Sequence, residues 1–255
     1  MNKILLSKRT INALEIASKF AKGDRFIFRV NEEIMNGRMG AINESSNTLL
    51  QFLPTEDFSN IENFSLNNFK RFIGTLSLFD SPSLSIDTDS KYINISESDN
   101  ASKNVTFPLA PDYYGTKGKF MNFSGDGSHL TIKITEDTWE IIHKLNRLYS
   151  IKGPENKTLF PNLTIVADNG IVSIRTGKNP EDNNCFKFDI GTCSKDKYLW
   201  NVIHSKNLLL LPKEECELNV YNCSLNRIFY PNTEYEFFIS SECGSKFEKE
   251  GETNE

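Results

Sequence analysis

The sequence has few of the features that mark a metal site or an enzyme. Its five cysteines stand at positions 185, 193, 216, 223 and 243, and no two of them form a C-x-x-C pair. The three histidines, His129, His143 and His204, are scattered, without an H-E-x-x-H motif, a nucleophile elbow or a Walker loop. We therefore expect no metal site, no cofactor and no enzymatic activity. A hydrolase that uses Asp or Glu side chains stays open, because carboxylates are abundant.

The chain also lacks a long apolar run and a surplus of positive charge. No stretch approaches the ~20 apolar residues that a membrane-spanning helix needs, and the start of the chain does not read as a signal peptide. The odd number of cysteines favours reduced thiols and a cytoplasmic setting. A net charge of -5 argues against a protein that coats nucleic acid with its whole surface. It remains compatible with one local basic stripe.

Amphipathic helices alternate with short strands along the chain. The first predicted helix begins after Ser7, a good N-cap, and its apolar residues recur at helical spacing up to Phe20. The opposite face carries Lys8, Lys19 and Lys22 and forms one basic stripe. Strands are predicted next at 24–30, 38–43 and 49–52, then a helix at 65–79, and then strands at 83–87, 92–96 and 104–109.

A similar order begins again after a segment at 110–122 that reads as a linker. Thr135 is predicted to cap the third helix, and Asp168-Asn169-Gly170 is a strong hairpin turn signal. A short helix is predicted at 205–211, and the last residues read as a charged, disordered tail. The predicted strands of this half are 128–134, 163–167, 171–175, 185–190, 198–203, 217–222, 227–230 and 235–239.

The repeat predicts an α+β fold of two similar domains, residues 1–118 and 119–240, followed by a tail at 241–255. Neither half is long enough to bury two amphipathic helices against each other as well as its strands. The simplest packing places both helices of a half on one face of an antiparallel sheet. The basic groups of all four helices would then share one surface.

The ordered pair of halves resembles the sliding clamps of DNA replication, and most closely the clamp of T-even-type bacteriophages. The resemblance spans about residues 3–240. It departs in a longer loop at 152–162 and in the acidic tail. The stretches that carry it are LSKRTINAL at 6–14, DRFIFRV at 24–30, SLNNFKRFIGTLSLFDSPSLSI at 65–86, IKITEDTWEIIHKLNRL at 132–148, LTIVADNGIVSIRTGKN at 163–179 and EYEFFIS at 234–240.

The resemblance implies a homotrimeric ring of the DNA-clamp fold that encircles duplex DNA without reading its sequence. Such a ring tethers the replicative DNA polymerase and makes synthesis processive. It also implies an ATP-driven clamp loader as a partner, a platform for late transcription in a phage, and a place in the cytoplasm of the infected bacterial host. The alternative from a different class is a β-rich structural or binding protein of a virion.

The helix faces and the resemblance together predict individual site residues. For ring closure, the resemblance suggests that 104–109 of one subunit pairs with 185–190 of the next, with Phe107 and Phe186 packing there; the alternative is that both rings lie in a subunit core. Pro111, Tyr113 and Tyr114 are the expected pocket for a partner peptide, or else simply exposed loop residues. The expected DNA-facing cations, each of which has an ordinary solvated side chain as its alternative, are Lys8, Lys19, Lys22, Lys70, Arg71, Lys117, Lys119, Lys144, Arg147 and Lys206.

Overall fold

The chain folds into two compact units. Unit 1 comprises residues 1–122 with 233–236, and unit 2 comprises residues 123–232 with 237–255. The predicted boundary at 118 lies four residues before this division. The computed structural model describes residues 3–20, 26–31, 34–42, 48–58, 64–66, 68–87, 91–100, 102–110, 127–154, 158–177 and 185–247.

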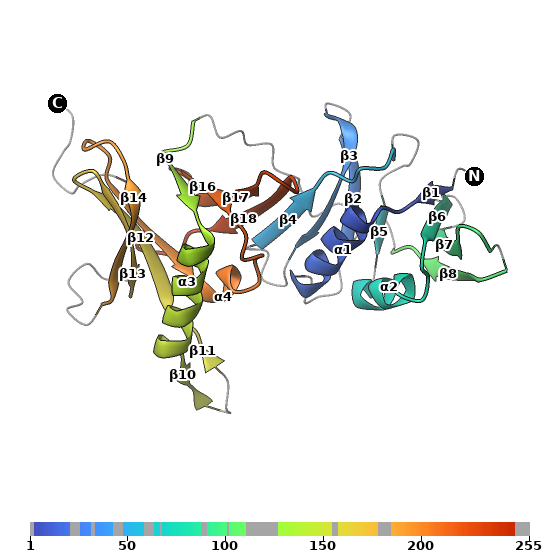
Figure 1. The fold of residues 1–255 in the computed structure, drawn as a ribbon, viewed down its shortest axis with the longest axis horizontal. Coiled ribbons are helices and arrows are strands. Elements are labelled where there is room, and N and C mark those ends of the chain that lie inside the picture. The colour runs from blue at the N-terminus through green and yellow to red at the C-terminus, as the bar shows by residue number, and fades with distance from the viewer. Residues whose placement is uncertain are drawn as a thin grey trace. The chain divides into compact units, whose positions relative to one another are not determined.

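The described residues of unit 1 form two helices and two sets of four antiparallel strands (Figure 1). The strand orders are β1-β6-β7-β8 and β5-β2-β3-β4. The helices contact each other, and α1 also contacts β3 and β4. The elements are β1 (Ile4–Leu5), α1 (Lys8–Phe20), β2 (Phe26–Asn31), β3 (Ile34–Ile42), β4 (Thr48–Phe52), β5 (Phe64–Leu66), α2 (Phe69–Leu76), β6 (Pro82–Asp87), β7 (Tyr92–Glu97) and β8 (Asn104–Pro108).

Unit 2 is built from the same kinds of element and adds one hairpin. Its strand orders are β9-β16-β17-β18 and β15-β12-β13-β14, and within the described residues β10 pairs only with β11. The elements are β9 (Leu130–Ile134), α3 (Glu136–Tyr149), β10 (Ile151–Lys152), β11 (Thr158–Leu159), β12 (Asn162–Asp168), β13 (Ile171–Thr176), β14 (Lys187–Thr192), β15 (Leu199–His204), α4 (Ser205–Leu208), β16 (Cys216–Tyr221), β17 (Leu225–Tyr230) and β18 (Tyr235–Ser240).

The two units share one topology. Each runs strand, helix, four strands, helix, three strands, apart from the β10–β11 hairpin that unit 2 inserts after its first helix. When β1 is matched to β9, β2 to β12 and so on along the chain, both strand orders of unit 1 coincide with those of unit 2. This duplication confirms the predicted α+β fold of two similar halves.

Local sequence signals account for where two of the helices begin. The Ser7 Oγ accepts a hydrogen bond from the Thr10 backbone N–H at 3.1 Å, which is N-capping as predicted. The Thr135 Oγ1 likewise accepts from the Thr138 N–H at 3.3 Å. Thr135 is followed by Glu136 and Asp137, whose negative charges the helix N-terminus favours.

The predicted bounds of several other elements are wrong. Helix α2 begins at Phe69 and not at 65, because Ser65 and Leu66 pair with β2 as part of β5 and Asn68 has a left-handed backbone, with φ 58°. Strand β3 begins earlier than 38, α4 ends at Leu208, and the expected loop at 152–162 contains β11. The sequence prediction placed Leu66 in α2 because its apolar side chain fits the helical spacing. Leu66 is indeed buried, but as a residue of β5 that pairs with β2.

Both helices of unit 1 bury their apolar faces. Ala13, Leu14 and Ala17 of α1 are at most 1% exposed. In α2, the Phe72 ring packs edge-on against Phe107 of β8, with ring centroids 5.4 Å apart. The helices therefore cover strands of both sets, where the sequence suggested a single sheet for each half.

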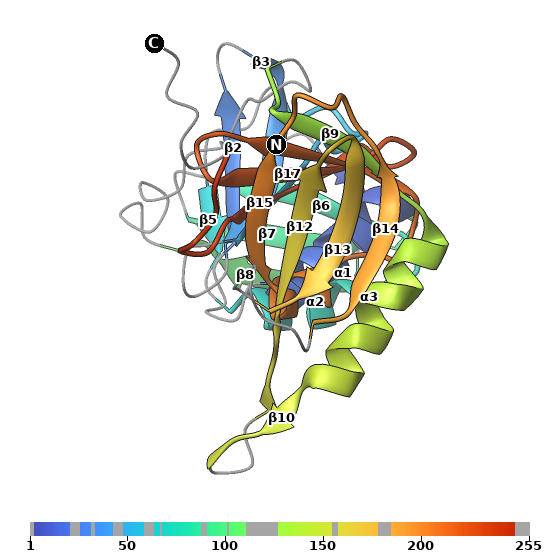
Figure 2. The same ribbon diagram turned by 90° about the vertical axis from the view of Figure 1, so that its left-hand side faces the viewer.

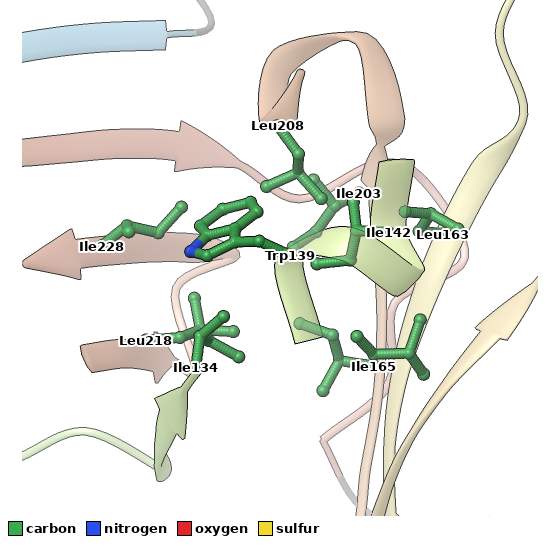
Figure 3. Close-up of a pocket in the computed structure, with 10 residues that line it drawn as sticks. Ile134, Trp139, Ile142, Leu163, Ile165, Ile203, Leu208, Leu218 and Ile228 are labelled. Carbon is green, nitrogen blue, oxygen red and sulfur yellow. The ribbon is translucent and has the colours of Figure 1, made fainter. Parts of the chain in front are cut away.

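The core of unit 2 lies between its two strand sets and is closed by α3 and α4. Trp139 of α3 stands at its centre, 1% exposed, and its indole N–H donates to the Glu214 carbonyl oxygen at 2.8 Å. Figure 3 shows side chains from α3, α4, β9, β12, β15, β16 and β17 converging around it. They leave an apolar gap of only about 20 Å³, which is a packing gap and not a ligand site.

The predicted disordered tail is wrong for residues 241–247, because this segment packs along the free edge of β15. The Trp200 N–H donates to the Lys246 carbonyl at 2.8 Å, the Lys246 N–H donates back at 2.7 Å, and the Glu242 N–H donates to the Val202 carbonyl at 2.8 Å. The segment therefore covers an edge that would otherwise expose unpaired backbone groups. Its charged composition gave no sign of this pairing.

Glu56 holds the N-terminal turn of α1 from outside the helix. Its carboxylate accepts hydrogen bonds from the Ser7 backbone N–H and from the Thr10 hydroxyl, the latter at 2.5 Å. Partial burial raises the pKa of Glu56, but the hydrogen bonds from Thr10 and Ser7 together outweigh it, so that the net pKa lies below its ordinary 4.5. A carboxyl whose folded pKa is lowered stabilises the fold above its unfolded pKa and loses that effect as pH falls through the folded value.

Replacing Glu56 by Gln is therefore expected to cost about 1 kcal/mol of unfolding free energy at pH 7. The cost should shrink between pH 7 and pH 3, because the negative charge of Glu56 is lost progressively as the pH falls through its folded pKa. Urea unfolding at both pH values measures the difference. Glu15→Gln, an exposed change on α1, is the control and should stay within about 0.5 kcal/mol. An equal loss for Glu56→Gln at both pH values would show that its charge plays no part.

Candidate functional site

Each unit carries exposed cations on its helices, opposite their buried faces. In unit 1 these are Lys8 and Lys19 of α1 and Lys70 and Arg71 of α2. In unit 2 they are Lys144 and Arg147 of α3 and Lys206 of α4. All seven predicted positions that the structure describes are thus available to solvent. Lys22, Lys117 and Lys119 lie outside the described residues.

Five of these seven cations form no ion pair with a carboxylate among the described residues. They are Lys8, Lys19, Lys70, Arg71 and Arg147. Lys144 pairs with Glu140 one turn earlier at 3.4 Å, and both side chains are well exposed. Exposed pairs of this kind contribute little and exchange readily for another anion.

Sequence reasoning missed a fourth basic group of unit 2, beside Lys144, Arg147 and Lys206. Lys213 follows α4, and it lies close enough to His143 of α3 to affect its titration. Burial lowers the pKa of His143 most, and the positive charges of Lys213 and Arg147 lower it further. The α3–α4 surface is therefore electropositive although His143 itself is neutral at pH 7. Only the folded structure brings Lys213 to this helix.

Metal-ligating side chains do not gather at one place among the described residues. No three His, Cys, Asp or Glu side chains among them stand close enough to hold a metal ion. Burial raises the pKa of the Cys216 thiol to about 12, so this cysteine stays protonated and is a poor nucleophile. Of the helices in the described part, none is both long and apolar enough to cross a membrane.

Comparison with known proteins identifies the fold. No protein-family model and no curated protein matches the chain. Solved structures do match it: PCNA from Thermococcus kodakaraensis has a TM-score of 0.63 at 14% identity, with 94% of this chain and 99% of that chain covered. The Helicobacter pylori beta clamp bound to a DNA ligase peptide has a TM-score of 0.67 at 12% identity, with 98% and 68% covered. The chain has the DNA-clamp fold.

The matched structures differ in how much of their own length is covered. A PCNA2–PCNA3 complex from Sulfolobus tokodaii matches at a TM-score of 0.62 and 12% identity, again with 94% of this chain and 99% of that chain covered. The two units therefore correspond to a whole PCNA chain. The same clamp fold corresponds to only about two thirds of the bacterial beta clamp.

The clamp fold leaves β8 and β14 as edge strands of their sets. Phe186, just before β14, is 41% exposed, and Phe188 within β14 is 38% exposed. Phe107 of β8 is only 5% exposed and packs on Phe72, so its ring lies in the core of unit 1, which was one of its two predicted alternatives. Pro111, Tyr113 and Tyr114 fall outside the described residues.

Proposed function

We propose that this chain is the subunit of a sliding clamp that encircles duplex DNA and tethers a replicative DNA polymerase. The duplicated topology carries the proposal, together with the match to PCNA over nearly the whole of both chains. The exposed cations on the helices of both units supply a surface for the phosphate backbone. The protein would act by keeping the polymerase on DNA and not by chemical catalysis.

A tether has to remain on DNA and still slide along it. Strong phosphate contacts would provide affinity, but they would also add friction and salt sensitivity. A closed ring separates the two demands, because its topology retains the DNA and only a modest positive lining is needed. Contacts to phosphates alone carry no base sequence information, which suits a clamp. The net charge of -5 is compatible with a lining confined to the helices.

Ring closure would use the two edge strands. An unpaired edge strand can pair with a strand of another chain. Strand β8 of one subunit would pair with β14 of the next, and Pro108 within β8 suits an edge position. Repeating this single contact around three copies closes a homotrimer. The exposed rings of Phe186 and Phe188 would lose solvent contact there.

The remaining partners and the setting follow from the resemblance of the sequence to T-even-type phage clamps. The proposal therefore includes loading by an ATP-driven clamp loader, a second role as a platform for late transcription, and action in the cytoplasm of an infected bacterial host. A partner peptide would bind near the linker that contains Pro111, Tyr113 and Tyr114.

The decisive test measures how long the loaded protein stays on DNA, compared on a circular plasmid and on the same plasmid linearised. Equal loss from both forms would refute a ring.

Charge reversal tests the helical lining separately from the ring. The triple variant Lys19→Glu, Lys70→Glu, Arg147→Glu is expected to bind a 30-base-pair duplex roughly tenfold or more weakly at low salt, with a smaller salt dependence. Fluorescence anisotropy across a salt series measures both effects. Because these side chains are exposed, light scattering should show an unchanged oligomeric state.

The matched control places three reversals outside the helices, at Lys3, Lys133 and Lys195. All three are exposed, and the Lys133–Glu215 pair that is lost contributes less than about 1 kcal/mol. The control should keep most of the DNA affinity. If both triple variants lost the same affinity, net charge and not a helical lining would govern binding.

A further inference from the structure

The β10–β11 hairpin is the one element of unit 2 that unit 1 does not repeat within the described residues. It follows the last turn of α3 and precedes β12, whereas α1 ends at Phe20 and β2 begins at Phe26. Figure 2 shows the hairpin projecting from the end of α3, away from the strands of unit 2. The packing of the unit therefore does not require it, and we looked for another role.

Large apolar side chains gather on this projection. Ile151 of β10 and Leu159 of β11 are directly opposite each other and are 62% and 49% exposed. Directly opposed residues of an antiparallel pair point to the same face. Leu148 and Tyr149, in the adjoining last turn of α3, are 76% and 39% exposed. Exposed apolar side chains that cluster in this way usually mark a binding surface, because each would gain by leaving water.

Among the described residues, the charged side chains beside the cluster are basic. Arg147 and Lys152 flank it and are exposed. Between Ile141 and Pro154, and again from Thr158 to Asn162, the described sequence contains no Asp or Glu. A partner that covers the apolar side chains would therefore gain from acidic groups at its rim.

The hairpin is also an incomplete sheet. Its two strands pair only with each other in the described structure, so both have an outer edge open to another strand. An isolated two-stranded ribbon is marginal in water, and a third strand adds hydrogen bonds and apolar contacts together. An extended peptide can bind such an edge, because it pairs with the unpaired backbone N–H and C=O groups of the outer strand.

We propose that the β10–β11 hairpin, with Leu148 and Tyr149, is a docking site for a partner protein, which binds through an extended segment of aliphatic or aromatic residues flanked by Asp or Glu. Duplex DNA fits less well, because phosphate contacts come from polar and basic groups and leave the Ile151–Leu159 pair without a role. This site is separate from β8 and β14, and it does not depend on whether the protein encircles DNA.

The test uses the full-length protein and a displayed library of random twelve-residue peptides as the probe. Enriched peptides should combine aliphatic or aromatic residues with Asp or Glu, and a synthetic copy of one should bind in solution. The double variant Ile151→Ser, Leu159→Ser should weaken that peptide at least tenfold. Lys152→Glu should weaken it several-fold, and Leu78→Ser, another exposed apolar position at 61%, is the control and should not.

Hydrogen exchange distinguishes strand addition from other ways of binding. Adding the peptide should protect backbone amides of residues 151–152 and 158–159. Peptides without acidic residues, or peptides indifferent to the double variant, would overturn the proposal. A loss of duplex affinity in the double variant would assign the hairpin to DNA instead, and a changed oligomeric state would assign it to a second copy of this chain. Neither of these two outcomes would contradict the sliding-clamp proposal, which is tested separately.

Discussion

Replacing Phe186 and Phe188 by glutamate is expected to leave single subunits where the proposed ring would otherwise assemble. Both rings are exposed in the isolated chain, at 41% and 38%, and β14 is the edge strand of its set. Each unpaired charge carried into the interface should cost about 3 kcal/mol, which is roughly a hundredfold in the dissociation constant for each substitution. Native mass spectrometry and light scattering over a range of protein concentrations measure the shift.

The same change should barely affect the folding of the subunit, since exposed substitutions usually change stability by less than about 0.5 kcal/mol. This sets it apart from a charge at Phe107, which would be buried against Phe72 and would damage the core of unit 1. Leu78→Glu, an exposed apolar residue after α2, is the matched control and should remain assembled. If the double glutamate variant stays trimeric, β14 is not the contact.

Deleting residues 241–255 is expected to destabilise unit 2 by about 4 kcal/mol or more. The deletion removes the backbone hydrogen bonds that residues 242 and 246 make with β15, each worth about 0.5–1.5 kcal/mol. It also breaks a closed buried network in which Asn201 donates to Asn226, Asn226 to Ser241, and the Ser241 hydroxyl back to Asn201, at 2.6, 3.1 and 2.6 Å. The two asparagines are fully buried and would lose a partner.

Urea unfolding measures the loss, and light scattering should also detect association through the uncovered edge of β15. Deleting only residues 248–255 is the control, because it keeps every hydrogen bond named above, and its effect should stay within about 0.5 kcal/mol. Equal stability of the two truncated proteins would contradict the structural role of residues 241–247.

Much of the fold could be predicted because its signals are local. The caps at Ser7 and Thr135, the turn at Asp168-Asn169-Gly170 and the helical spacing of apolar residues depend on neighbours only a few positions away. The same spacing also placed Lys19 and Lys70 opposite the buried faces of their helices, and both are exposed. The order of elements, read twice along the chain, then led to the fold class.

What failed were features decided by residues distant in sequence. Leu66 fitted the helix pattern but joins a strand beside β2. For Phe107 the sequence left a subunit interface and a subunit core open, and only its packing against Phe72 distinguishes them. The tail looked too charged to fold, yet its backbone groups pair with β15. Lys213 has no local signal at all, since its proximity to His143 arises from packing.

The sequence by itself determined which segments form helices and strands, which helix faces carry positive charge, and that one architecture occurs twice. The tertiary structure alone decided which strands end as edges, which aromatic rings are buried, and that the β10–β11 hairpin stands exposed. The physical reason is range: capping and periodicity act over a few residues, whereas strand pairing and burial depend on contacts that form only when distant segments meet.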